Sequence, residues 1–113
     1  IWCPKYRRKV LKNNISKRLK ELIIQKSNKI GVSVENIEIM EDHVHLFVKA
    51  PPIACPHWIV QQFKGYSSRI LRNEFHELKT KLPTLWTRSY YCETVGNISE
   101  ESIKKYIENQ KNK

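Results

Sequence analysis

Apolar and polar side chains alternate along much of residues 34–50, on both sides of an acidic dipeptide, Glu41-Asp42. Alternation with a period of two is typical of a half-buried β-strand, because successive side chains point to opposite faces. Two such stretches joined by a tight turn predict a β-hairpin with strands over residues 34–40 and 43–50. The hairpin constrains the fold strongly, since a lone hairpin is marginal and needs other elements to cover its apolar face.

The second of these strands places two histidines on one face. His43 and His45 are two residues apart and so lie on the same face of the strand. The opposite face is apolar through Val44, Leu46 and Val48, so the core does not need the histidines. Two imidazoles side by side on a strand can hold a metal ion. Acidic residues precede the pair, so we interpret it as a metal site rather than as two structural histidines.

Helical spacing of apolar residues predicts a helix on each side of the hairpin. The first is expected to begin at Asn13 or Asn14, one of which would cap it, and to end at Gly31. The second is expected over residues 56–75, with Pro56 as its first helical residue. Residues 79–83 are expected to form a basic loop.

Strands are also expected over residues 1–6 and 86–95, and a last helix is expected from Asn97 or Ser99 onward. The order β-α-β-β-α-β-α predicts a single α+β domain over residues 1–113. Its first six elements match the ferredoxin-like split β-α-β pattern, an antiparallel sheet with two helices on one face. The added C-terminal helix could cross to the histidine face. Because Ile1 falls inside the first expected strand, we expect further residues before it.

The chain is strongly basic. It has 21 Lys and Arg against 11 Asp and Glu, a net charge of +10. A polyanionic partner explains this better than solubility alone, and nucleic acid explains it better than a membrane, because no basic amphipathic helix with an aromatic face is evident. No stretch approaches the ~20 apolar residues of a membrane helix, and no signal peptide is visible. The three cysteines are widely spaced without a C-x-x-C pair, which predicts reduced thiols in a cytoplasmic protein.

Tyr106 and Gln110 are four residues apart, so they share a face of the last expected helix. Taken alone, Tyr106 is better explained as a packed residue, since it shares that face with Ile103, and Gln110 as a surface residue. A tyrosine brought up to a metal-bound phosphate could instead cut nucleic acid through a covalent phosphotyrosine. Both interpretations stay open on the residues alone.

The order of the motifs is more specific than any one of them. In the order of its motifs, the chain resembles the single-tyrosine HUH transposases of small bacterial and archaeal insertion sequences. The matching blocks cover nearly the whole chain: Trp2-Cys3-Pro4-Lys5-Tyr6-Arg7-Arg8-Lys9, Met40-Glu41-Asp42-His43-Val44-His45-Leu46, Gln62-Phe63-Lys64-Gly65-Tyr66-Ser67-Ser68-Arg69, Leu85-Trp86-Thr87-Arg88-Ser89-Tyr90-Tyr91 and Tyr106-Ile107-Glu108-Asn109-Gln110. The family usually has a proline where this chain has Glu41.

This resemblance implies a site and a reaction. His43, His45 and Gln110 would hold a divalent metal ion, Mg²⁺ or Mn²⁺, and Tyr106 would be the catalytic nucleophile. The substrate would be single-stranded DNA with a hairpin near each end of the element, cut and rejoined by a homodimer whose active sites can be shared between subunits. The expected DNA-binding residues are Lys5, Arg7, Arg8, Lys64, Ser67, Ser68 and Arg69.

Other functions compete with this one. A domesticated relative that processes chromosomal repeats, or a replication or conjugation nickase, would use the same chemistry; Tyr106 has no second tyrosine on its expected helix, which disfavours many conjugation nickases. A non-catalytic module that binds single-stranded nucleic acid would need no Tyr106. A phosphoesterase with paired His-x-Thr motifs would need two motifs, and the chain has one histidine pair.

Overall fold

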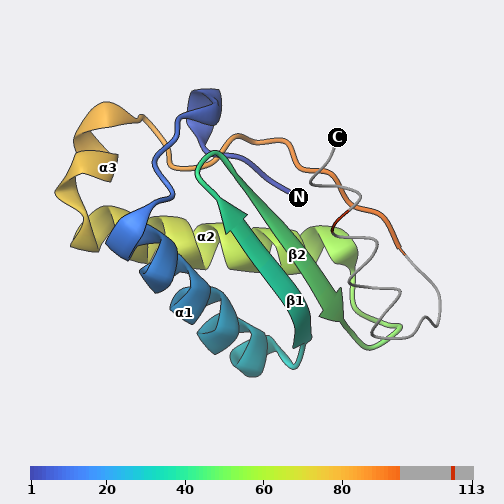
Figure 1. Cartoon of the computed structure of the whole chain (residues 1–113). Helices are drawn as coiled ribbons and strands as arrows, with labels where there is room; N and C mark the ends of the chain where they lie inside the picture. Colours follow the sequence, from blue (N-terminus) through green and yellow to red (C-terminus); the bar gives the residue numbers. More distant parts are fainter. Residues whose placement is uncertain (95–107, 109–113) are drawn as a thin grey trace.

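The structure, a computed structural model of the whole chain, describes residues 1–94 and residue 108. Within them the fold is α+β, with a two-stranded antiparallel sheet and three α-helices (Figure 1). The elements in chain order are a 3₁₀ turn at Lys5–Arg7, α1 (Asn13–Ile30), β1 (Ser33–Met40), β2 (His43–Lys49), α2 (Pro56–Glu74) and α3 (His76–Lys81). Of the last expected helix only Glu108 is described, and it is helical; Tyr106 and Gln110 lie outside the described residues.

The predicted hairpin is confirmed. β1 pairs with β2 through a tight turn at Glu41 and Asp42, with Met40 opposite His43. The register shifts by one residue near Glu35, where Val34 pairs with Val48 but Asn36 pairs with Phe47. Such a bulge bends and twists the end of the strand, and it leaves the register at the histidine end regular.

The expected strand over residues 1–6 is shorter than predicted. Trp2 forms an isolated antiparallel bridge with Val44, and Pro4 forms another with Trp86. Pro4 has no N–H to continue a ladder, and Tyr6 takes a φ of 61°, so the chain turns away into the 3₁₀ turn. The strand expected over residues 86–95 is likewise shorter than predicted. Within residues 86–94 it is reduced to the bridge at Trp86.

Helix α1 carries the apolar face that its spacing predicts. Ile15, Leu19, Leu22 and Ile23 are buried, and Gly31 ends the helix in a left-handed conformation with φ 73°, as expected for a C-terminal glycine. The predicted asparagine cap is wrong, because Lys12 occupies the cap position and its side chain makes no capping hydrogen bond. Asn13 instead has φ 55°, a conformation that asparagine tolerates better than most residues.

Helix α2 begins at Pro56 and ends one residue earlier than predicted. The expected loop over residues 79–83 is wrong at its start, since α3 extends to Lys81. Leu78 and Leu82 explain the difference: both are buried, so the segment folds back onto the core instead of running free over the surface. The apolar side chains buried between the two long helices and the hairpin include Phe63, Leu71 and Val44.

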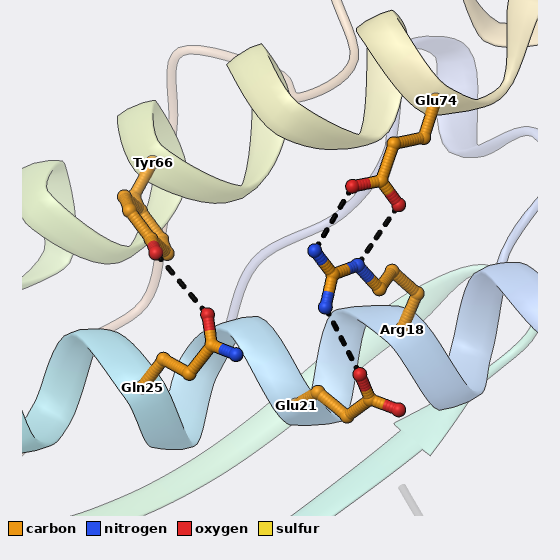
Figure 2. A network of polar contacts seen from close by, with 5 residues as sticks. All are labelled: Arg18, Glu21, Gln25, Tyr66 and Glu74. Carbon is orange, nitrogen blue, oxygen red and sulfur yellow. Dashed lines mark hydrogen bonds and ion pairs between the residues drawn. The ribbon is translucent and has the colours of Figure 1, made fainter.

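An ion pair joins α1 to α2 at the surface (Figure 2). Arg18 donates from Nε and Nη2 to the two carboxylate oxygens of Glu74, both at 2.9 Å, and from Nη1 to Glu21 at 3.0 Å. These contacts lower the pKa of Glu74, chiefly through the hydrogen bonds from Arg18, and raise the pKa of Arg18. One turn further along α1, Tyr66 of α2 donates to Gln25 at 3.2 Å. These contacts form a seam between α1 and α2. Helix α1 also packs against β1, so the seam fixes both helices relative to the hairpin.

No helix in the described part of the chain is both long enough and apolar enough to cross a membrane.

Candidate functional site

His43 and His45 lie side by side on β2. Their ring centroids are 4.7 Å apart and the ring planes are inclined by 63°. Val44 between them is fully buried in the core, and Leu46 and Val48 pack against the same core, as predicted for that face of the strand. The hairpin register and the Trp2–Val44 bridge hold the strand on both sides of the pair, so the two imidazoles have a rigid support.

Asp42 fixes the ring of His43. Its Oδ1 lies 2.6 Å from Nδ1 of His43, and its Oδ2 accepts a hydrogen bond from Arg7 at 3.3 Å. The hydrogen bond with His43 is the main cause that lowers the pKa of Asp42, and the charge of Arg7 adds to it. An ionised carboxylate only accepts hydrogen bonds, so the proton of a neutral His43 ring belongs on Nδ1 and Nε2 keeps its lone pair.

The histidine face is less exposed than the sequence suggests. His45 retains 5% of its accessible surface and His43 is partly buried. Within residues 1–94 and 108, no three His, Cys, Asp or Glu side chains come together as a ligand set. A metal ion held by this pair would take a further ligand of another type or from another part of the chain. The predicted third ligand, Gln110, and the predicted nucleophile, Tyr106, lie outside the described residues.

The histidine pair fits a small divalent ion in its chemistry. Imidazole nitrogens are good ligands for divalent metals, and a metal-bound histidine usually donates its other ring N–H to a carboxylate or a carbonyl. Asp42 supplies that acceptor for His43. An amide oxygen such as that of Gln110 would complete a set without net charge.

The predicted DNA-binding residues divide into two groups. Arg7, Arg8 and Arg69 are exposed, and Lys5 and Ser68 are partly exposed. The guanidinium of Arg69 lies 5.9 Å from the ring centroid of Tyr66, and Arg7 reaches Asp42 as described. These side chains are accessible to a polyanion.

Lys64 and Ser67 form the second group, and both are buried. Lys64 donates to the backbone oxygens of Thr87 at 2.6 Å, and of Arg88 and Ser89 at 3.4 Å. Ser67 donates to the oxygen of Phe63 within its own helix at 2.7 Å. Burial lowers the pKa of Lys64. In this structure both side chains make hydrogen bonds within the protein.

Ser67 also receives a hydrogen bond at 3.1 Å from the indole N–H of Trp86, which is buried. Neither this link nor the three carbonyl partners of Lys64 could be predicted from the sequence, because they join residues 19 to 25 positions apart. The i, i+3 spacing of Lys64 and Ser67 on one helix face was the one available signal. The link between Asp42 and His43 was suggested only by adjacency.

Aromatic side chains of the described residues differ in exposure. Trp86 is buried in the core, whereas Trp58 and Tyr91 are 46% and 54% exposed. Tyr90 is partly buried, and its hydroxyl lies 2.8 Å from Nδ1 of His57. The three cysteines are unpaired thiols, of which Cys55 and Cys92 are exposed.

Comparison with known families and proteins gives a consistent result. Residues 1–110 match the family described as "Transposase IS200 like". The chain is 37% identical to the ISDra2 transposase TnpA of Deinococcus radiodurans, over all of this chain and 82% of that protein. It is 29% identical to the transposase for insertion sequence element IS200 of Salmonella typhimurium, over 97% of this chain and 73% of that protein.

A solved structure has the same arrangement. The crystal structure of a Deinococcus radiodurans R1 protein, described as that of a transposase, superposes with a TM-score of 0.77 at 34% sequence identity. The match covers 96% of this chain and 85% of the other.

Proposed function

Because the chain belongs to the IS200-like transposase family, we propose that it cuts and rejoins single-stranded DNA at the ends of an insertion sequence through a tyrosine at a histidine-bound metal ion. Membership of the family establishes a transposase; the strand chemistry, the metal and the hairpin substrate are our proposal. The observation that supports them is the pair His43–His45 on one strand face, with Asp42 bonded to Nδ1 of His43.

His43, His45 and Gln110 would hold the metal ion. Two neutral imidazoles and one amide oxygen bring no negative charge, and Mg²⁺ prefers oxygen ligands, so Mn²⁺ is expected to bind more tightly than Mg²⁺. When bound, the ion neutralises negative charge that develops on the scissile phosphate. The rigid strand sets the direction of both imidazoles before DNA arrives.

Tyr106 would act as the nucleophile. Its hydroxyl oxygen forms a bond to phosphorus while the bond from phosphorus to the 3′ oxygen breaks, and the phenolic proton is lost to solvent or a base. The released oxygen takes up a proton as a free 3′-hydroxyl, and the other DNA end stays on the protein as a 5′-phosphotyrosine. Attack by a 3′-hydroxyl from another strand end reverses the step and joins DNA without ATP, because the phosphodiester energy is kept.

The exposed basic residues would contact the DNA backbone. Lys5, Arg7 and Arg8 belong to the chain around the 3₁₀ turn, and Arg7 reaches the residue that precedes the histidine pair. Arg69 and Ser68 present a second contact on α2. Lys64 and Ser67 have an indirect role in this proposal, since their bonds fix the segment that contains Trp86 and Thr87.

The sheet of the family would extend the hairpin to four strands in the ferredoxin-like order. Its support here is the pairing of residues 2–5 with β2 and with residues 85–87, including Thr87 N–H to the oxygen of Cys3 at 3.0 Å and Lys5 N–H to the oxygen of Leu85 at 2.8 Å. The active form would be a homodimer that recognises hairpins and can share the tyrosine helix between subunits.

A covalent-capture assay tests this function. The full chain is incubated with 3′-labelled single-stranded DNA that carries the hairpin end, with Mg²⁺ or Mn²⁺, and resolved on a denaturing protein gel. We expect label that stays on the protein and disappears with EDTA, with Tyr106→Phe or with His43→Ala. Tyr91→Phe is the matched control, because Tyr91 is an exposed tyrosine outside the proposed site. Tight hairpin binding without an adduct in either metal would contradict the proposal and leave a binding module.

A further inference from the structure

We propose that Asp42 is the positioning residue of the metal site, which sets the tautomer of His43 so that Nε2 is free to bind the ion. The inference rests on the proposed role of His43 as a metal ligand. It assigns a function to a residue outside the proposed DNA contacts and the proposed bond changes.

The contact itself is short and partly shielded from water. Oδ1 of Asp42 lies 2.6 Å from Nδ1 of His43, and the side chains retain 26% and 20% of their accessible surface. A hydrogen bond to an ionised group in this setting is stronger than one between neutral groups. The turn places Asp42 directly before the strand, so few side-chain rotations are needed to hold the contact.

The charge of Asp42 makes the contact directional. A carboxylate offers only acceptors, so it selects the ring form with the proton on Nδ1. A metal needs an unprotonated nitrogen, which that form provides on Nε2. An asparagine of the same shape could donate its amide hydrogens to Nδ1 and select the opposite tautomer, with the proton on the nitrogen that must bind the ion.

Arg7 is a secondary part of this arrangement. It holds Oδ2 of Asp42 at 3.3 Å, but its side chain is 65% exposed, and an exposed ion pair contributes little. Arg7 is therefore free to serve mainly as a DNA contact, and its loss should change metal binding far less than the loss of Asp42.

Glu41 offers a matched control. It is an exposed carboxylate next to Asp42 in the same turn, so Glu41→Gln removes the same charge near the site without touching the His43 ring. Any effect of Asp42→Asn beyond that of Glu41→Gln therefore belongs to the contact and not to the general field of a nearby anion.

The test is Mn²⁺ binding to the DNA-free chain. Binding is measured as the loss of the electron paramagnetic resonance signal of the free ion. We expect Asp42→Asn to weaken binding about 10- to 100-fold, the range for a lost outer-shell partner. Glu41→Gln should stay within about twofold, and His43→Ala should bind weakest. If His43→Ala binds as wild type does, the proposed metal site itself is wrong. If His43→Ala loses binding but Asp42→Asn matches Glu41→Gln, the inference about Asp42 is wrong while the metal site stands.

A second measurement can overturn the inference on the wild-type chain alone. Long-range ¹H–¹⁵N correlation spectra at about pH 8, where a neutral imidazole is the ordinary form, report which ring nitrogen carries the proton. We expect His43 of the metal-free wild type to carry it on Nδ1, and Asp42→Asn to shift the population toward Nε2. A wild-type ring protonated on Nε2 would overturn the inference.

Discussion

The ammonium group of Lys64 lies 2.6 Å from the backbone oxygen of Thr87, 23 residues further along the chain. It also reaches the carbonyls of Arg88 and Ser89, so the three hydrogens of one buried cation meet three successive backbone oxygens. Those carbonyls therefore turn toward α2 instead of continuing a β-ladder. This contact explains why the segment after Trp86 is not a regular strand although its residues favour one.

Lys64→Met tests the contact as a structural one. The substitution keeps most of the apolar stem but removes the charged donor of three part-buried hydrogen bonds, which typically costs about 1–3 kcal/mol. We expect the free energy of unfolding, measured by urea denaturation, to fall by that amount. Lys20→Met is the control, since Lys20 is exposed on α1 and should change stability by less than about 0.5 kcal/mol. Equal stability of the two variants would show that the Lys64 contact contributes nothing.

The exposed arginine Arg8 should instead reveal itself through salt. The logarithm of the affinity falls linearly with the logarithm of the salt concentration. Each phosphate contact that is lost makes this slope shallower by about 0.7 to 1. We expect Arg8→Gln to reduce the slope for single-stranded DNA by about this amount, measured in EDTA so that no cleavage occurs. Lys64→Met should leave the slope unchanged. A reduced slope for Lys64→Met would indicate that Lys64 leaves its carbonyl partners and contacts DNA.

Two glycines should respond to alanine with opposite signs. Gly65 lies inside α2, and a Cβ there meets no atom of the described residues within 4 Å, so Gly65→Ala should raise the free energy of unfolding by up to about 1 kcal/mol. Gly31 has equal space but a φ of 73°, so Gly31→Ala should lower it by about 1–2 kcal/mol. Thermal unfolding of both variants checks the pair, and a loss of stability in Gly65→Ala would reveal a neighbour that the described residues do not include.

The Arg18–Glu74 pair predicts a pH dependence. Arg18 lowers the pKa of Glu74 in the folded protein, so the folded state favours the ionised carboxylate more than the unfolded state does. This stabilisation is complete above the ordinary glutamate pKa of about 4.3 and is lost as the pH falls through the lower, folded value. Wild type should therefore unfold at a higher temperature than Glu74→Gln at neutral pH, with a difference that shrinks as the pH falls below about 4.

Glu41→Gln provides the comparison for that experiment, because Glu41 is exposed and away from the seam between α1 and α2. We expect it to follow wild type across the whole pH range. A difference between wild type and Glu74→Gln that persists undiminished in acid would show that the pair acts through packing and not through charge.

The local parts of the fold could be predicted from the sequence. The hairpin follows from alternation around Glu41 and Asp42, and the ends of the long helices follow from Gly31 and Pro56, whose backbone preferences act within a few residues. Two of the failures have distant causes. The helix over His76–Lys81 depends on burying Leu78 and Leu82 in a core made by other elements, and the irregular segment after Trp86 depends on Lys64.

The candidate site divides in the same way. His43 and His45 could be predicted to share a face, because side chains two residues apart on one strand point to the same side. The burial of Lys64 and Ser67 could not be seen, because a basic and a polar side chain on a helix are usually exposed and only the fold reveals their partners. The roles of Tyr106 and Gln110 rest on the family resemblance and remain predictions.

The most direct measurement locates the covalent bond to DNA. The adduct formed with Mn²⁺ and hairpin DNA is digested with nuclease and trypsin, and the modified peptide is identified by mass spectrometry. The account predicts a nucleotide or phosphate on Tyr106, within the peptide that follows Lys105. Modification of any other tyrosine, or cleaved DNA without a protein-bound end, would contradict a tyrosine transposase that works through Tyr106.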